Sequence, residues 1–221
     1  MNYFKINGLI LNKKNIKEKS SIVYILTQNL GIIKGKIDGL NRSEGKLLSI
    51  IQPANFGKFF LSSESTFFKI LSFLPYKIPS RVFQKFPYTY LWALKFLILF
   101  NFLSTSTKFF EKIVNLDKYL LKNKSSFLIW YLKIIFEELG VLPNLTNCSE
   151  CGRLLKGNIY YQGSKLYCYK CRKISYDRIN FTTYKLMISF LKEDRLLNLR
   201  NKFLREIFKK IFKNHLKEIS L

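Results

Sequence analysis

The chain has 221 residues, enough for two small domains, and 48% of them are hydrophobic, enough to build buried cores. It carries 38 Lys and Arg residues against 14 Asp and Glu residues, a formal net charge of +24. This excess indicates an anionic partner such as nucleic acid or an anionic membrane surface. The few, scattered acids disfavour an enzyme that holds two metal ions with carboxylates. The two ends of the chain are its most basic parts, residues 1–80 and 148–221.

Five short runs of β-branched and aromatic residues occupy the first 75 residues. Polar or glycine-containing turns separate them, and Asn29-Leu30-Gly31 is a plausible hairpin turn between the second and third runs. Five strands of this length predict a small closed barrel. The predicted strands are residues 3–12, 21–27, 31–38, 55–61 and 66–73.

Basic residues cluster on this predicted barrel, near its first turn, along its third strand and in the loop at 39–46. We interpret them as contacts to a nucleic-acid backbone, because such barrels hold single strands by charge and aromatic stacking. A solvated, lysine-rich surface is the alternative. Tyr3, Phe4 and Tyr24 are possible stacking residues, although core positions are the more common place for aromatic side chains in a small barrel. The candidate nucleic-acid-binding residues are Lys13, Lys14, Lys34, Lys36, Arg42 and Lys46.

From about residue 87 the apolar residues recur three and four positions apart, which predicts helices. The predicted helices are residues 88–103, 107–121 and 126–139. Pro75 and Pro79 predict a linker before them, and Gly140 followed by Pro143 predicts a helix end after them. The first of these helices is the most apolar, but it is too short for a bilayer and contains Lys95, so we expect a buried core helix rather than a membrane span.

All four cysteines lie in two C-x-x-C pairs, Cys148 with Cys151 and Cys168 with Cys171, and sixteen residues separate the pairs. This spacing predicts a closed tetrahedral site for one structural zinc ion. The alternatives are an iron ion in a similar four-sulfur site and a set of reduced cysteines that no longer binds a metal. The N-terminus lacks the apolar segment of a secretory signal, and reduced cytosolic thiols favour metal over disulfides. Because no ligand position is left open for water, we expect the site to support the fold rather than to catalyse a reaction.

Residues 159–167, between the two cysteine pairs, are predicted to form a hairpin that delivers the second pair. Helical spacing returns at 182–192 and at 196–217. In the last segment Ile207 and Ile211 belong to an apolar row flanked by Lys and Arg. We expect that row to pack on its own domain, with binding to a membrane or to DNA as the alternative.

The sequence contains no signature of a catalytic site. It has no Gly-rich phosphate loop ending in Gly-Lys-Ser/Thr and no H-E-x-x-H motif, and Glu137-Glu138 is a lone acidic pair near a helix end. His215 is the single histidine of the chain and has no histidine partner. We therefore expect no catalytic residues and predict that the protein is not an enzyme.

The order of these parts resembles the RecO family of bacterial mediators of recombinational DNA repair. The most specific similarity is the Leu-Gly-x-x-Pro helix end at 139–143, which leads into the first cysteine pair. The Gly163-Ser164 turn before the second pair also fits, as do Leu30-Gly31 and Gln52-Pro53 in the barrel. The resemblance covers nearly the whole chain.

The resemblance implies an α+β fold, in which an N-terminal five-stranded OB-type β-barrel precedes an all-helical domain that carries a four-cysteine zinc-finger insertion. The expected boundaries are 1–79 for the OB-fold nucleic-acid-binding domain and 80–221 for the helical domain. The zinc finger is expected at 148–171, inserted within the helical domain. The implied cofactor is one structural zinc ion.

The resemblance also implies a non-enzymatic mediator that binds single- and double-stranded DNA and anneals complementary strands. With RecR, it would help to load RecA onto DNA coated with single-strand-binding protein (SSB). In this family the helical domain receives the C-terminal tail of SSB, and Lys133 and basic positions of the last helix are candidates for the basic rim of that pocket. Such a protein is expected in the cytoplasm, associated with the nucleoid and not with a membrane. An RNA-binding zinc and OB protein in ribosome assembly or translation is one alternative, and a nuclease that uses Glu137 or Glu138 is another.

Overall fold

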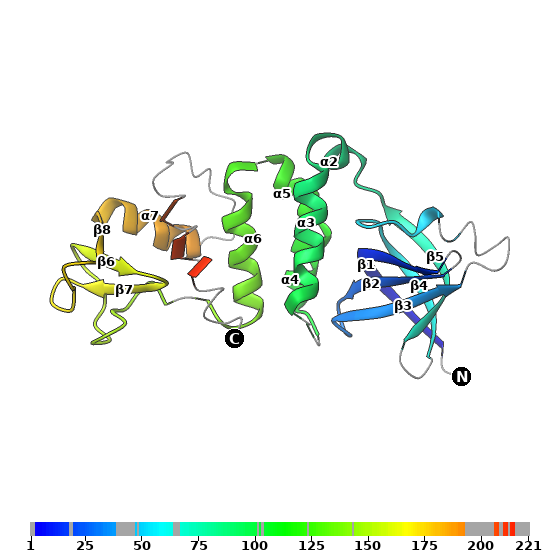
Figure 1. Ribbon diagram of the computed structural model, residues 1–221, viewed down its shortest axis with the longest axis horizontal. Helices are drawn as coiled ribbons and strands as arrows, with labels where there is room; N and C mark the ends of the chain where they lie inside the picture. The colour runs from blue at the N-terminus through cyan, green and yellow to red at the C-terminus, as the bar shows by residue number, and fades with distance from the viewer. Residues whose placement is uncertain are drawn as a thin grey trace. The chain divides into compact units, whose positions relative to one another are not determined.

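The computed structural model consists of two compact units, Met1–Leu121 and Lys122–Leu221 (Figure 1). The structure describes residues 3–17, 20–38, 47, 49–63, 67–100, 102, 104–122, 124–142, 144–192, 206–207, 210–211 and 213–214. Two of the predicted DNA contacts, Arg42 and Lys46, lie outside these residues, as do the loop at 39–46 and most of the predicted last helix at 196–217.

The first unit begins with a closed five-stranded barrel, which confirms the predicted OB-type fold. Around the barrel the strands follow the order β1-β2-β3-β5-β4, antiparallel except where β3 pairs in parallel with β5. The strands are β1 (Tyr3–Lys17), β2 (Ser20–Thr27), β3 (Ile32–Asp38), β4 (Phe56–Ser63) and β5 (Phe68–Lys77). The hairpin turn between β2 and β3 forms as predicted, with Gly31 at a positive φ of 59°.

Alternation along the strands sends one set of side chains into the barrel and the other set to its outer face. In β2 the odd-numbered residues Val23 and Ile25 are fully buried, whereas Ile22 and Tyr24 are half-buried. A bulge between Ile10 and Asn12 shifts this alternation within β1. The core that closes the barrel contains Ile10, Val23, Ile25, Ile33, Ile37, Leu47, Ile51, Phe59, Leu61, Ile70 and Phe73.

The predicted linker begins later than expected, because Pro75 lies inside β5 opposite Gly57. β5 pairs with β3 only at Phe68 and Lys69. Because Pro75 lies beyond this pairing, its missing N–H removes no hydrogen bond between β5 and β3. Gly57 is required here, because a Cβ atom at this position would lie 2.2 Å from the Leu74 carbonyl oxygen.

Helices follow the barrel in the first unit and differ from the prediction in two places. They are α2 (Ser80–Lys85), α3 (Pro87–Leu97), the 3₁₀ turn η1 (Ile98–Phe100), α4 (Thr107–Val114) and α5 (Leu116–Lys122). The predicted helix at 88–103 therefore ends as a 3₁₀ turn, and the one at 107–121 is two helices. Asn115 breaks the latter, with φ −101° and ψ 18°, and its side-chain amide donates a hydrogen bond to the Glu111 carbonyl.

Polar contacts connect the barrel to the segment between η1 and α4 and to helix α5 within the first unit. The Ile32 N–H donates to the Phe102 carbonyl (3.0 Å), and the Thr105 N–H donates to the Gln28 carbonyl (3.1 Å). At the end of β5, the Lys77 ammonium group forms an ion pair with Asp117 on α5. Among the described residues, no helix is long and apolar enough to cross a membrane.

The second unit begins with helix α6 (Lys124–Glu138), which ends at Gly140 as predicted. Gly140 has a φ of 69° and donates its N–H to the Glu137 carbonyl, and the Val141 N–H donates to the Phe136 carbonyl. This pair of bonds is the Schellman termination. Lys133, predicted at a basic rim, is instead 2% exposed in α6 and lies 3.4 Å from the Glu137 carboxylate, so that prediction is wrong.

The rest of the second unit is a three-stranded sheet and a helix. The hairpin expected at 159–167 consists of β6 (Ile159–Gln162) and β7 (Lys165–Cys168), and β8 (Asp177–Ile179) pairs with the other edge of β6. Helix α7 (Phe181–Lys192) starts where the Asn180 side chain accepts the Thr183 N–H at 2.7 Å. In the described part of the last segment, Ile207 and Ile211 are buried, as the apolar row predicts.

Candidate metal site and nucleic-acid surface

The two cysteine pairs meet in one cluster. The four Sγ atoms of Cys148, Cys151, Cys168 and Cys171 all lie within 4.8 Å of one another. The Sγ atoms of Cys151 and Cys168 are 3.8 Å apart. Four thiolates at about 2.3 Å from one zinc ion in a tetrahedron place neighbouring sulfurs about 3.8 Å apart. A disulfide would require about 2.05 Å. The cluster therefore fits a metal ion.

Local backbone hydrogen bonds shape both knuckles. In the first, the Gly152 N–H donates to the Cys148 carbonyl (2.9 Å), and Gly152 adopts a φ of 68° that turns the chain back. In the second, which follows the end of β7, the Cys171 N–H donates to the Cys168 carbonyl (3.2 Å). The Cys168 N–H also points at the Cys148 sulfur, at 3.4 Å. The hairpin thus brings the second pair onto the first.

The environment of Cys148 favours the thiolate form. Burial opposes ionisation, but hydrogen bonds from the backbone N–H groups of Cys151, Cys168 and Glu150 outweigh it and lower the pKa of the Cys148 thiol to about 6. The pKa of Cys171 is raised to about 12, chiefly by its hydrogen bond with Cys151. A deprotonated thiol is the form of cysteine that ligates a metal ion, so the environment of Cys148 suits a ligand.

The second group of predicted residues lies on the outer face of the barrel. Pairing places Lys14 opposite Ile22 and Ile22 opposite Lys36, so these three side chains form one row across β1, β2 and β3. A neighbouring row runs through Asn12, Tyr24 and Lys34. The Lys34 ammonium nitrogen lies 5.9 Å from the centroid of the Tyr24 ring. The structure therefore brings Lys14, Lys34 and Lys36 onto one face.

Lys13 does not belong to that face. It pairs with Val23, whose side chain is in the barrel core, so Lys13 projects from the opposite side of β1 to Lys14. Partial burial lowers the pKa of its ammonium group. Any contact of Lys13 with a nucleic acid would have to be made separately from those of the other three lysines.

One member of the row was missed in the sequence. β3 and β5 pair in parallel with Lys36 opposite Lys69, which extends the row to a fourth strand. Neighbouring strands are about 4.8 Å apart, so the two ammonium groups can serve one stretch of backbone. A lysine inside an apolar strand, with Ile70 in the core beside it, was the available signal. We call Lys14, Lys34, Lys36 and Lys69 the lysine face.

The three aromatic residues proposed for stacking have different positions. Tyr3 is 71% exposed, and Tyr24 is half-buried on the outer face beside Lys34. Phe4 instead packs against the barrel core, with its ring 5.5 Å from the Phe68 ring in an edge-to-face arrangement. The stacking role therefore fits Tyr3 and Tyr24 and does not fit Phe4.

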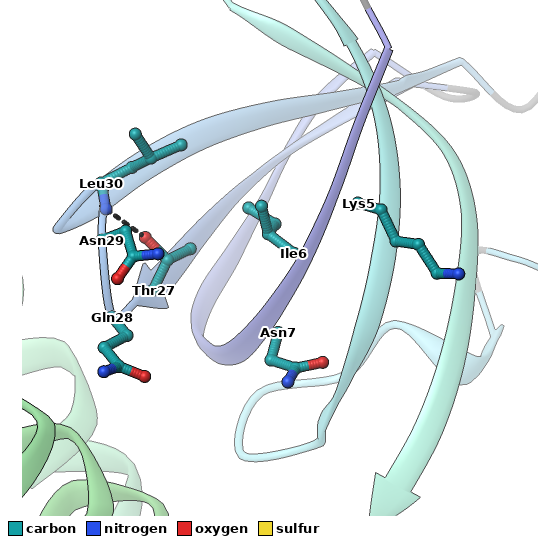
Figure 2. Close-up of a pocket in the computed structure, with 7 residues that line it drawn as sticks. All are labelled: Lys5, Ile6, Asn7, Thr27, Gln28, Asn29 and Leu30. Carbon is teal, nitrogen blue, oxygen red and sulfur yellow. Dashed lines mark hydrogen bonds between the residues drawn. The ribbon is translucent and has the colours of Figure 1, made fainter.

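A pocket of about 220 Å³ lies between the first half of β1 and the turn that joins β2 to β3 (Figure 2). Its lining residues are Lys5, Ile6, Asn7, Thr27, Gln28, Asn29 and Leu30. Figure 2 shows the Lys5 side chain pointing away from the turn, and the Leu30 N–H donating to the Thr27 hydroxyl. The Gln28 amide donates to Thr107 at 2.6 Å. This lining offers amides, an ammonium group and the Thr27 hydroxyl, which donates to the Gly31 carbonyl at 3.0 Å, and it contains no carboxylate, histidine or cysteine.

Residues 1–74, which contain most of the barrel, match the family model described as "Recombination protein O N terminal". The DNA repair protein RecO of Alkaliphilus metalliredigens is 24% identical over 226 residues, with 96% of this chain and 92% of that protein covered. The DNA repair protein RecO of Thermodesulfovibrio yellowstonii is 24% identical over 188 residues, with 76% and 70% covered. The chain is therefore similar to RecO proteins, in the barrel by the family model and along most of its length by the two relatives. The family match falls on the barrel, which also holds the lysine face, and the longer alignment extends RecO similarity into the second unit.

Proposed function

We propose that this chain is a non-enzymatic mediator of recombinational DNA repair that binds single- and double-stranded DNA and anneals complementary strands. The lysine face on a barrel that matches the RecO family model is the observation that carries the proposal. Its four lysines come from three strands, β1, β3 and β5, which is a suitable arrangement for following a phosphate backbone. Such contacts confer affinity and salt dependence but no sequence preference.

Annealing brings two polyanions together, and the main barrier is their repulsion. A chain with a net charge of +24 can neutralise both strands, release their counterions and lower that barrier without nucleotide hydrolysis. The proposed contacts are Lys14, Lys34, Lys36 and Lys69, with Lys13 on the other side of β1. Arg42 and Lys46 remain predicted contacts on the basis of the sequence.

The four-cysteine cluster is proposed to hold one structural zinc ion. Thiolate donors at this separation suit zinc, and a site closed by four protein ligands stabilises a fold rather than activating a water molecule. The division into an OB-fold domain at 1–79, a helical domain at 80–221 and a zinc finger at 148–171 is part of the same proposal.

On the basis of its similarity to RecO proteins, the chain is proposed to act in the cytoplasm at the nucleoid, with RecR, in loading RecA onto DNA coated with SSB. The C-terminal tail of SSB is the proposed partner of the helical domain. Because Lys133 is buried, the basic rim for that acidic tail must come from other residues.

The test is annealing of two complementary single strands, each coated with SSB, without nucleotide and across a salt series. The proposal predicts fast annealing that slows steeply as salt rises. A variant with Lys34→Gln and Lys36→Gln should anneal more slowly, and a control with Lys85→Gln and Lys95→Gln, two exposed helix lysines, should not. Absence of annealing together with tight binding to folded RNA would refute the proposal and favour the RNA-binding alternative.

A further inference from the structure

A second surface of the barrel exposes aromatic side chains between lysines. The first half of β1 pairs with β4, and β4 pairs with β5. On the outer side of these three strands Tyr3, Phe60 and Tyr76 are 71%, 36% and 49% exposed. Lys5 lies opposite Phe60, and Lys58 comes two residues before Phe60 along β4. We call Tyr3, Lys5, Lys58, Phe60 and Tyr76 the aromatic face.

Each lysine of the aromatic face lies over a ring. The Lys5 ammonium nitrogen is 5.6 Å from the centroid of the Phe60 ring, and that of Lys58 is 5.7 Å from the centroid of the Tyr76 ring. Attraction between an ammonium group and an aromatic face restrains both side chains. The result is a repeated unit of one cation next to one exposed ring.

Contacts with other aromatic rings fix the position of the Tyr76 ring. It packs edge-to-face on Phe56 at 6.0 Å, and Phe56 packs in the same way on Phe110 of α4 at 6.1 Å. Tyr76 itself occupies a bulge of β5, because Gly57 pairs with Pro75 and Phe56 with Lys77. A bulge re-aims a side chain, and here it directs the Tyr76 ring to the outer face beside Lys58.

The charged side chains of the three strands that carry the aromatic face are all positive. β1, β4 and β5 contain no Asp or Glu residue. An anionic partner would therefore approach the aromatic face without repulsion from these strands. Exposed rings in such a setting favour an anionic polymer that also presents flat, apolar surfaces.

We infer that the aromatic face is a second DNA site, which binds single-stranded DNA by stacking unpaired bases on Phe60 and Tyr76 while Lys5 and Lys58 contact its phosphates. It shares no residue with the lysine face but adjoins it, because Lys69 lies opposite Ser62 and Ser62 lies opposite Tyr3. The inference rests on the proposed role in DNA binding. It adds that one barrel can hold a single strand by stacking and a second strand by charge.

Single-stranded DNA fits this face better than duplex DNA does. Stacking on a side chain requires an unpaired base, and in a duplex the base faces are covered by their neighbours. The lysine face, whose one ring is the half-buried Tyr24 beside Lys34, relies mainly on charge and suits either form. The two faces should therefore differ in their preference for single strands.

The experiment is ultraviolet crosslinking of the zinc-loaded full chain to an oligonucleotide containing bromodeoxyuridine, with mapping of the crosslinked peptides. Affinities for the same oligonucleotide and for a duplex are measured by fluorescence anisotropy. The test variant carries Phe60→Leu and Tyr76→Leu, which keep an apolar side chain but remove the ring. Tyr88→Leu is the control, because Tyr88 is 88% exposed on α3 and outside both faces.

We expect crosslinks in the β4 and β5 peptides and a loss of about tenfold or more in single-strand affinity for the double variant, with little change for duplex. The control should match the wild type. Wild-type binding without crosslinks at β4 or β5, or an equal loss for single strand and duplex, would overturn the stacking site and leave the lysine face standing. No DNA binding by the wild type would overturn both proposals, as would binding of an acidic peptide in place of DNA.

Discussion

The Sγ atoms of Cys151 and Cys168, which come from different knuckles, lie 3.8 Å apart, the separation of two thiolates that share one zinc ion. We therefore predict that the purified protein contains about one zinc per chain, the content of a single four-thiolate site. Removing the ion with a chelator should lower the thermal midpoint by about 10 °C or more, because the second unit loses the bond between its knuckles. Metal analysis and a thermal melt measure both quantities.

A substitution separates this effect from general damage by the chelator. Cys168→Ser should abolish stoichiometric zinc and lower the melting midpoint to that of the chelated protein. Ser149→Ala, an exposed position on the same knuckle, should keep both at wild-type values. Full zinc content in the Cys168→Ser protein would contradict the four-ligand site.

The lysine face leads to a prediction about salt. For single-stranded DNA the logarithm of the binding constant falls with the logarithm of salt concentration, with a slope of about −0.7 per neutralised phosphate. Replacing Lys14, Lys34 and Lys36 together by Gln should reduce that slope by about 2. The measurement is anisotropy of a labelled oligonucleotide from low to moderate salt.

A charge-matched control distinguishes direct phosphate contacts from the effect of net charge. Lys85, Lys95 and Lys118 are exposed lysines on helices of the first unit, and their replacement by Gln removes the same net charge. The control should weaken binding slightly through the general field and leave the slope unchanged. Equal slopes for the two triple variants would show that the lysine face makes no direct phosphate contact.

Much of the barrel could be predicted from the sequence, because alternation of apolar residues is a local pattern. Val23 and Ile25 reveal an inward face without knowledge of their partners. The pairing between strands is not local. The juxtaposition of Lys36 and Lys69 depends on the parallel closure of β3 against β5, which no short segment encodes. For that reason one member of the lysine face was missed, and the sequence did not show that Lys13 and Lys14 lie on opposite sides of β1.

The helical part shows the same limit. Apolar spacing identified the helices but not the break at Asn115, where a side-chain hydrogen bond to the Glu111 carbonyl competes with the helix. Lys133 looked like a surface residue because lysine usually is one. Its burial depends on the packing of α6 and on its ion pair with Glu137, neither of which periodicity shows. The cysteine cluster, by contrast, could be predicted from spacing alone.

The ion pair between Lys77 and Asp117 gives a stability prediction for the first unit. The Lys77 ammonium lies 2.5 Å from the Asp117 carboxylate and also donates to the Val114 carbonyl at 2.8 Å, and the side chains are only 27% and 12% exposed. Asp117→Asn should cost about 1–3 kcal/mol, because a charged hydrogen bond is lost and Lys77 keeps its charge. Urea unfolding measures this cost. Glu111→Gln, an exposed acid on α4, should change stability by less than about 0.5 kcal/mol.

Gly57 provides the last prediction, because it allows β5 to lie close against β4. A Cβ atom at Gly57 would meet two backbone atoms, the Leu74 oxygen at 2.2 Å and the Pro75 Cα at 2.9 Å, and backbone cannot move aside without displacing the strand. At Gly35 a Cβ would meet only side-chain atoms, the Ile70 Cδ1 at 2.6 Å and Cγ1 at 2.7 Å, which can shift by a change of rotamer without moving the backbone.

Gly57→Ala should therefore cost about 3 kcal/mol, at the upper end of overpacking, and Gly35→Ala should cost about 1 kcal/mol. Urea unfolding of the two proteins compares them directly, with each serving as the control for the other. Because the strand shift at Gly57 also moves the bulge that holds Tyr76, Gly57→Ala should weaken single-strand binding more than duplex binding. Equal costs for the two substitutions would contradict the close contact between β4 and β5.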